Sequence, residues 1–329
     1  MTRPTATSDA TDEPGTATSL HTARPGSHRR RRRGHLAATR RTEGLLLAAP
    51  ALVFLAALLL FPLLYNLVTS FLDVDLAGLL GEGTPFVGGE NYRAAVSESD
   101  FWAAVGLTLV FTVGSLVLQF GIGFALALLF ARDFPFNGLL RSLMLVAWLL
   151  PPVVSGSLFR WMLDGDVGAY NAILRSLGLD ALTNTWLTDT GTALGGVIFA
   201  NVWIGVPFNM ILLLVGLVSL DRDLYASAAL DGASAWQRFR FVTLPLMRPV
   251  SAAVLLLGLI YTFKAFDIVF VMTGGGPVDA TRVLPLLAYE QFFEFFRFGE
   301  GAAITVLLLV IPLVVSIWYV RRIGKEGDR

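Results

Sequence analysis

The sequence predicts an all-α membrane protein that crosses the bilayer several times, and three observations lead to this fold class. The 329 residues are 55% hydrophobic and only 15% charged, whereas a soluble domain carries about 25% charged residues. Several uncharged runs reach the roughly 20 residues that a spanning helix needs. These runs lack the period-2 alternation of transmembrane barrel strands, so each must satisfy its backbone hydrogen bonds as a helix.

A polar tail precedes the first apolar run. Residues 1–43 contain nine arginines, five of them consecutive at 29–33. We predict a solvated cytoplasmic tail, because basic runs fix the orientation of the adjacent helix. A patch for nucleic acid or anionic lipid is the alternative. We expect membrane lipid around the chain and no nucleic-acid partner. The basic run is too long for a cleaved signal peptide.

Six apolar segments follow the tail, at about 44–70, 102–130, 139–162, 192–217, 249–272 and 301–320. An even number of crossings places both ends of the chain on one side of the membrane. Of the 25 Lys and Arg residues, 19 fall in the N-terminal tail, the loop near 132–141, the 217–248 loop and the C-terminal end. The positive-inside rule makes these segments cytoplasmic. We therefore expect a six-helix domain over 44–320, a cytoplasmic loop at 218–248 and a short tail at 321–329.

Small residues and prolines within these segments indicate how the helices pack. Gly121, Gly123, Ala125 and Ala127 form two interleaved pairs that let helices approach closely. Pro151-Pro152 and Pro207 should kink or locally unwind the third and fourth spans. Either ordinary packing or a role in a gate explains these prolines.

The polar loop between the fourth and fifth apolar segments is the main functional candidate. Tyr225–Leu230 predicts a compact helix of small residues, and Gly232 predicts a break after it. A second helix carries three residues on one face: Trp236, Phe239 and Thr243. We expect Pro245 and Pro249 to end this helix and to open the fifth span. A helical hairpin beside the membrane suits docking to a soluble partner, although an amphipathic loop on the membrane surface fits the same pattern.

The order of motifs resembles permease subunits of ATP-binding-cassette importers. Asp231-Gly232-Ala233, Phe239 and Leu244-Pro245 are similar to the cytoplasmic "EAA" loop of that family. The likeness covers roughly 44–320, and further matching residues resemble the first permease of maltose-type carbohydrate importers: Asn201, Trp203, Pro207-Phe208, Phe266-Asp267, Thr273 to Pro277, Thr281, Phe298-Gly299 and Ala302-Ala303.

The resemblance implies a type I importer permease fold in a bacterial plasma membrane and a transport subunit that is not an enzyme. It implies three kinds of protein partner: a second permease subunit, two ATPase subunits and an extracytoplasmic sugar-binding protein. It also implies that ATP and Mg are used by the partner ATPase and that this chain itself binds no cofactor. Nine loop residues would couple to the ATPase: Tyr225, Ala226, Ser227, Ala228, Asp231, Gly232, Ala233, Phe239 and Pro245. Ala226 stands where the family usually has a glutamate, so shape and Asp231 would carry the docking.

Polar residues within the apolar spans are candidates for the solute path, because such groups are costly in a membrane. Six are candidates: Asn201, Trp203, Asn209, Tyr261, Lys264 and Asp267. Sugars need hydrogen-bond partners and an aromatic face, which these residues offer. For the polar residues taken singly, packing between helices is the alternative. Lys264 and Asp267 lie three apart, so they either pair on one helix or line the path.

Catalytic motifs are absent from the sequence. It contains no His-Glu-x-x-His, Walker A or Gly-x-Ser-x-Gly segment and no cysteine, and its three histidines all lie in the tail, so we expect no metal site. We predict import of a di- or oligosaccharide. The alternatives are a permease for glycerol phosphate or another small polar solute, and a membrane scaffold or enzyme without transport activity.

Overall fold

The computed structural model describes residues 47–326. Contacts divide the chain into one unit that ends at Phe61 and a second that begins at Pro62. The described part of the first unit is helical and includes a π-helical turn, η1 (Ala56–Leu60). The predicted tail at 1–43 and the last three residues lie outside the described range. Apart from the helix Leu47–Thr69, whose residues fall in both units, the features below belong to the second unit.

The structure is helical, as predicted. Four helices are long and apolar enough to cross a membrane: Leu47–Thr69, which ends in α2 (Phe61–Thr69), α4 (Ser99–Phe130), α8 (Ala193–Val218) and the segment Phe298–Tyr319 of α15 (Phe298–Glu326). Two bent pairs raise the number to six if each pair is one span. Between 47 and 326, extended pairing is limited to an isolated bridge between Leu72 and Phe86.

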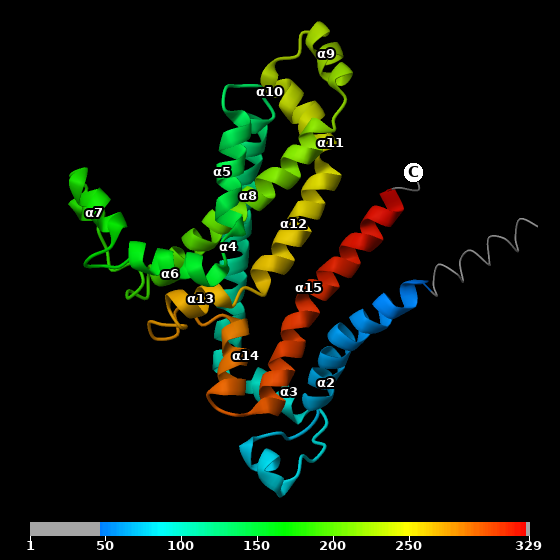
Figure 1. Cartoon of the computed structure of the whole chain (residues 1–329), viewed down its shortest axis with the longest axis vertical. Coiled ribbons are helices and arrows are strands. Elements are labelled where there is room, and N and C mark those ends of the chain that lie inside the picture. The colour runs from blue at the N-terminus through cyan, green and yellow to red at the C-terminus, as the bar shows by residue number, and fades with distance from the viewer. Residues whose placement is uncertain (1–46, 327–329) are drawn as a thin grey trace, which may run out of the picture. The chain divides into compact units, whose positions relative to one another are not determined.

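The shorter elements connect these spans. On the way to α4 the chain forms η2 (Gly78–Glu82) and α3 (Glu90–Ser97), and ahead of α8 it forms α7 (Ala169–Ser176) and η3 (Asp180–Leu182). The loop after α8 holds α9 (Arg222–Leu230), α10 (Ala235–Arg238), the π-turn η4 (Phe239–Thr243) and α11 (Leu244–Leu246). The helix α14 (Leu284–Phe293) packs beside α15 (Figure 1).

The predicted proline kink in the third span is confirmed. The helices α5 (Asn137–Leu149) and α6 (Pro152–Met162) meet at 95°. Leu150 and Pro151 are both extended there, with ψ of 137°, because a residue that precedes proline is forced out of the helical region. The prediction that the helix locally unwinds at Pro207 is wrong, since α8 continues through this residue without interruption. Pro207 is buried among neighbouring helices, and such packing tolerates a lost backbone bond.

Close packing of α4 against α8 forms the core of this unit. A Cβ at Gly123 would lie 2.8 Å from the Cβ of Asn209, and Ala127 is fully buried. One of the two small-residue pairs therefore lies in the contact, as predicted for close helix approach. The other pair does not, because Gly121 and Ala125 are exposed. The two helices together form one wall of a cavity.

Candidate functional site

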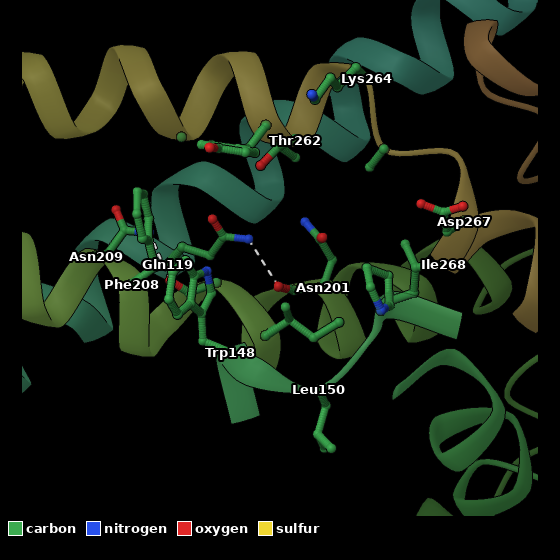
Figure 2. A pocket seen from close by; sticks show the side chains of 16 residues that line it. Gln119, Trp148, Leu150, Asn201, Phe208, Asn209, Thr262, Lys264, Asp267 and Ile268 are labelled. Carbon is green, nitrogen blue, oxygen red and sulfur yellow. Dashed lines mark hydrogen bonds between the residues drawn. The ribbon is translucent and has the colours of Figure 1, made fainter. Parts of the chain in front are cut away.

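A cavity of about 350 Å³ lies between α4, α8 and the break in the third span, with α12 (Arg248–Phe263) and the start of α13 (Asp267–Met272) on its far side (Figure 2). We call it the central cavity. Its polar wall is formed by six residues: Gln119, Asn201, Asn209, Thr262, Lys264 and Asp267. Five of the six predicted path residues line it: Asn201, Asn209, Tyr261, Lys264 and Asp267. Helices far apart in sequence thus bring the predicted residues together.

Gln119 links the two helices of the core at the cavity wall. Its side-chain amide donates to the backbone carbonyl of Asn201 at 3.0 Å (Figure 2). The carboxamide lies so close to Gly205 that a Cβ there would overlap it. Gly205 is therefore required for this close approach, and Gln119 is held in one position across the α4–α8 contact.

Two asparagine side chains carry polar atoms that find no partner within the described part of the chain. Asn209 donates from Nδ2 to the carbonyl of Gly205 at 2.9 Å, which leaves its Oδ1 buried without a hydrogen bond. The Nδ2 of Asn201 is likewise buried and unbonded. Such groups cost free energy unless a partner arrives. Both residues line the cavity, and each has one buried polar atom without a hydrogen bond there.

Aromatic rings form a continuous row along the same cavity. Trp148 stacks on Phe208 with ring centroids 5.5 Å apart, and Phe208 meets Tyr261 edge-on at 5.7 Å. Lys264 Nζ lies 5.4 Å from the centre of the Tyr261 ring. A cavity with an apolar aromatic wall and a few fixed polar groups is the usual form of a small-molecule site.

The expectation that Lys264 and Asp267 lie on one helix is wrong. The helix α12 ends at Phe263 and α13 begins at Asp267, so the two charged residues bound a non-helical break. No ion pair joins them, although both line the cavity. Lys264 instead approaches a ring, and both side chains remain exposed to the cavity. The alternative, that they line the path, fits this geometry.

Trp203 is the predicted path residue that lies outside the central cavity. It is 37% exposed and packs edge-on against Phe159 at 5.4 Å. Among the lining residues that were not predicted are two aromatic side chains and one hydroxyl group, those of Trp148, Phe208 and Thr262. Trp148 and Phe208 look like ordinary apolar positions in sequence, and they meet because α5 packs against α8.

The loop after α8 forms two helices joined by a tight turn, which we call the loop hairpin (residues 221–246). Gly232 has φ of +78°, a conformation that favours glycine. The Ala233 amide donates to the Ala228 carbonyl at 2.9 Å and the Gly232 amide to Ala229 at 3.1 Å. This is the Schellman arrangement that ends a helix at glycine. The predicted break at Gly232 is therefore confirmed.

The second arm of the loop hairpin is fixed against the rest of the chain. Ser234 and Gln237 form a reciprocal capping box at the start of α10. The hydroxyl of Tyr225 lies 3.0 Å from that of Thr243, which joins the two arms. The Phe239 ring packs edge-on against Phe124 of α4 at 6.0 Å. Phe239 thus anchors the hairpin to α4.

The prediction that Pro245 and Pro249 end the second helix and open the next one is confirmed, since α11 ends at Leu246 and α12 begins at Arg248 with Pro249 in its first turn. The chain passes through the π-turn η4 and continues as α11 to Leu246. Proline is tolerated here because it occupies the first turn of α11, where a missing N–H costs little. The bend of 65° comes afterwards, between Leu246 and Arg248.

The nine predicted coupling residues occupy different parts of the loop hairpin. Ala226, Ser227, Asp231 and Gly232 are exposed, whereas the others are half-buried: Tyr225, Ala228, Ala233, Phe239 and Pro245. A shallow hollow of about 310 Å³ surrounds the turn and is lined by Ala228, Asp231, Gly232 and Ala233. The turn thus presents small side chains and one carboxylate at the end of the hairpin.

The chain is similar in sequence and in fold to known proteins. Residues 119–324 match the family described as "Binding-protein-dependent transport system inner membrane component". The trehalose/maltose transport system permease protein MalF of Thermococcus litoralis is 36% identical over 237 residues, which cover 72% of this chain and 79% of that protein. The diacetylchitobiose uptake system permease protein DasB of Streptomyces coelicolor is 32% identical and covers 86% of this chain and 87% of the relative.

A solved structure gives the same arrangement of helices. A chain of a bacterial ABC transporter involved in the import of the acidic polysaccharide alginate superposes with a TM-score of 0.72 at 22% identity, over 87% of this chain and 99% of the other. The chain therefore belongs to the family of inner membrane components of binding-protein-dependent transport systems, the permease subunits of ABC importers, which carry solutes rather than catalyse reactions and work with a binding protein and an ATPase.

Proposed function

We propose that this chain is one of two permease subunits in an ATP-driven importer of a di- or oligosaccharide. The observation that carries the proposal is the central cavity, where unbonded side-chain atoms of Asn201 and Asn209 lie beside the aromatic row. A sugar offers hydroxyl groups to the two asparagine side chains and apolar ring faces to the aromatic row. The relatives named for trehalose, maltose and diacetylchitobiose support this solute class.

The cavity is less suited to a phosphorylated solute. Lys264 is the one basic residue in its lining, and Asp267 lies in the same wall. Phosphate sites usually present several charged donors or a helix N-terminus. Glycerol phosphate therefore remains the weaker candidate, and a scaffold or enzyme finds no support in the geometry.

The proposed partners are those of an importer complex. The central cavity is open rather than enclosed by this chain alone, so a second permease subunit would complete the path. An extracytoplasmic sugar-binding protein would deliver the solute, and two ATPase subunits would use ATP and Mg. The loop hairpin would dock on an ATPase, with both chain termini on the same cytoplasmic side and the spans in a bacterial plasma membrane.

The docking residues are those around the hairpin turn. Ala226, Ser227 and Asp231 are exposed on or beside α9, and their small size suits insertion into a cleft. Tyr225 and Phe239 hold the hairpin from inside through Thr243 and Phe124. Motion of an ATPase would thus pass through the hairpin to α4, which carries Gln119 in the cavity wall.

The test is a complementation experiment. The chromosomal gene for this chain is deleted, the chain is expressed from a plasmid, and uptake is measured. We expect the chain to restore uptake of labelled trehalose, maltose or diacetylchitobiose but not of glycerol 3-phosphate. An ATPase should co-purify with it, and ATP turnover in that complex should rise when the sugar-loaded binding protein is added. Restored glycerol 3-phosphate uptake without any sugar uptake would overturn the solute class, and purification without an ATPase would overturn the coupling.

A further inference from the structure

A second cavity lies where the loop hairpin meets the ends of two membrane helices. It encloses about 740 Å³ and we call it the basic cavity. Its floor is apolar and comes from the last turns of α4 and α8 and the residues just after them: Leu128, Ala131, Leu217, Val218 and Leu220. Because α4 and α8 are candidate membrane spans that stay apolar up to Phe130 and Val218, we place these ends near the lipid headgroups.

The rim of the basic cavity carries one sign of charge. Arg132, Arg222 and Arg238 line it, and no acidic side chain does. None of the three arginines forms an ion pair within residues 47–326, and the Nε of Arg238 is buried without a hydrogen-bond partner. Arg238 as a whole is half-buried and Arg132 and Arg222 are exposed, so the guanidinium groups are open to an anion, which would form charge-assisted hydrogen bonds with them. The charge of this rim therefore calls for an anionic ligand.

Aromatic side chains complete the cavity. Trp236 is largely exposed at its edge, and Tyr225 and Phe239 line its wall. Tryptophan and tyrosine favour the boundary between headgroups and acyl chains, since their rings are apolar and their tips polar. An apolar floor, an aromatic edge and a basic rim together match a molecule with a negative headgroup and a hydrocarbon chain.

We propose that the basic cavity binds an anionic phospholipid, with the phosphate at Arg132 and Arg222 and an acyl chain along Leu128 and Leu217. Basic pockets between membrane helices are known to suit such headgroups. The site lies on the inner side of the loop hairpin, whereas the hollow around Gly232 lies at its turn, and of the lining residues only Arg238 is shared. A lipid here would hold the hairpin against α4 and α8. The proposal does not depend on which solute the permease carries.

The test is lipid binding to the purified full-length chain in detergent, measured by native mass spectrometry. Dioleoyl phosphatidylglycerol and dioleoyl phosphatidylcholine are titrated separately. We expect tighter binding of phosphatidylglycerol. The double variant Arg132→Gln/Arg222→Gln should weaken that binding about thirtyfold, since each basic residue near a membrane surface contributes about 1 kcal/mol.

A matched control removes two charges from the same loop. Arg240 and Arg248 are exposed and do not line the basic cavity, so Arg240→Gln/Arg248→Gln should bind phosphatidylglycerol as the natural chain does. Arg132→Lys/Arg222→Lys should retain binding, which separates lost charge from lost folding. An excess of glycerol 3-phosphate should not displace the lipid, because it cannot occupy the apolar floor.

Four results would overturn the proposal. The first is equal binding of the two lipids, and the second is equal weakening in the control variant. The third is loss of binding in the lysine variant, which would mean that positive charge at these two positions is not enough to bind the lipid. The fourth is displacement by glycerol 3-phosphate, which would identify a soluble anion as the occupant.

Discussion

The side-chain amide of Gln119 donates to the main-chain carbonyl of Asn201 at 3.0 Å, and this bond joins α4 to α8 at the wall of the central cavity. The acceptor is a backbone atom, so this bond does not involve the side chain of Asn201, which lines the cavity. Because α4 also contacts the loop hairpin through Phe124 and Phe239, one helix touches both functional regions. Variants at this contact and in the loop hairpin test the two regions separately.

Asn201→Ala should weaken sugar uptake while leaving the fold intact. The variant removes the unbonded Nδ2 but keeps the carbonyl that accepts from Gln119. One hydrogen bond contributes about 1 kcal/mol, so we expect the KM for uptake to rise about fivefold. Trp203→Phe is the control, because Trp203 lies outside the cavity. An equal loss of uptake in both variants would remove the distinction on which the site is based.

Gly205→Ala should lower the stability of the chain. A Cβ at this position would overlap the Gln119 carboxamide and break its bond to Asn201. Overpacking of this kind typically costs about 1–3 kcal/mol, which thermal unfolding of the purified chain in detergent would detect. Gly195→Ala on the same helix is the control, since nothing lies within 4 Å of its Cβ position. An unchanged melting temperature in the Gly205 variant would contradict the close approach of α4 and α8.

Gly232→Val should abolish uptake without removing the chain from the membrane. Gly232 has φ of +78°, where a β-branched residue is strained, so the turn and its exposed residues would be displaced. Gly232→Asn should retain uptake, because asparagine tolerates this conformation better than other residues. The measurement is uptake in cells with chain levels checked by immunoblot. Full transport by the valine variant would show that the turn does not dock.

Glu290 should make stability depend on pH through a charge cluster at the start of α14. Arg282 contacts three carboxylates, those of Asp100 at 2.5 Å, Asp279 at 3.3 Å and Glu290 at 3.8 Å. Burial raises the pKa of Glu290 from 4.5 to about 7, and Arg282 offsets this only in part. The helix α14 is not one of the candidate membrane spans.

The sign follows from the direction of this pKa shift. An acid whose pKa is higher in the folded than in the unfolded chain favours folding while it is protonated, so its contribution is present below pH 4.5 and is lost as the pH rises to about 7. We expect Glu290→Gln to gain melting temperature relative to the natural chain as the pH rises from about 5 to 8. A constant difference across this range would show that Glu290 does not titrate there.

The order of apolar and polar segments was enough to predict the helical class, because a backbone in lipid has few alternatives to the helix. The motif Asp231-Gly232-Ala233 likewise predicted the turn of the loop hairpin, since the φ of +78° at Gly232 favours glycine. Local chemistry explains both successes, as each depends on a short stretch of neighbouring residues.

The contents of the central cavity depended on contacts that no local pattern reveals. Trp148 and Phe208 belong to different helices and meet because α5 packs against α8. Lys264 and Asp267 were expected on one helix, but the chain leaves the helix between them. Sequence alone therefore determined the helical class and where the hairpin turns. The tertiary structure decided which polar groups share a cavity, because distances between helices are set by side-chain packing across them rather than by spacing along the chain.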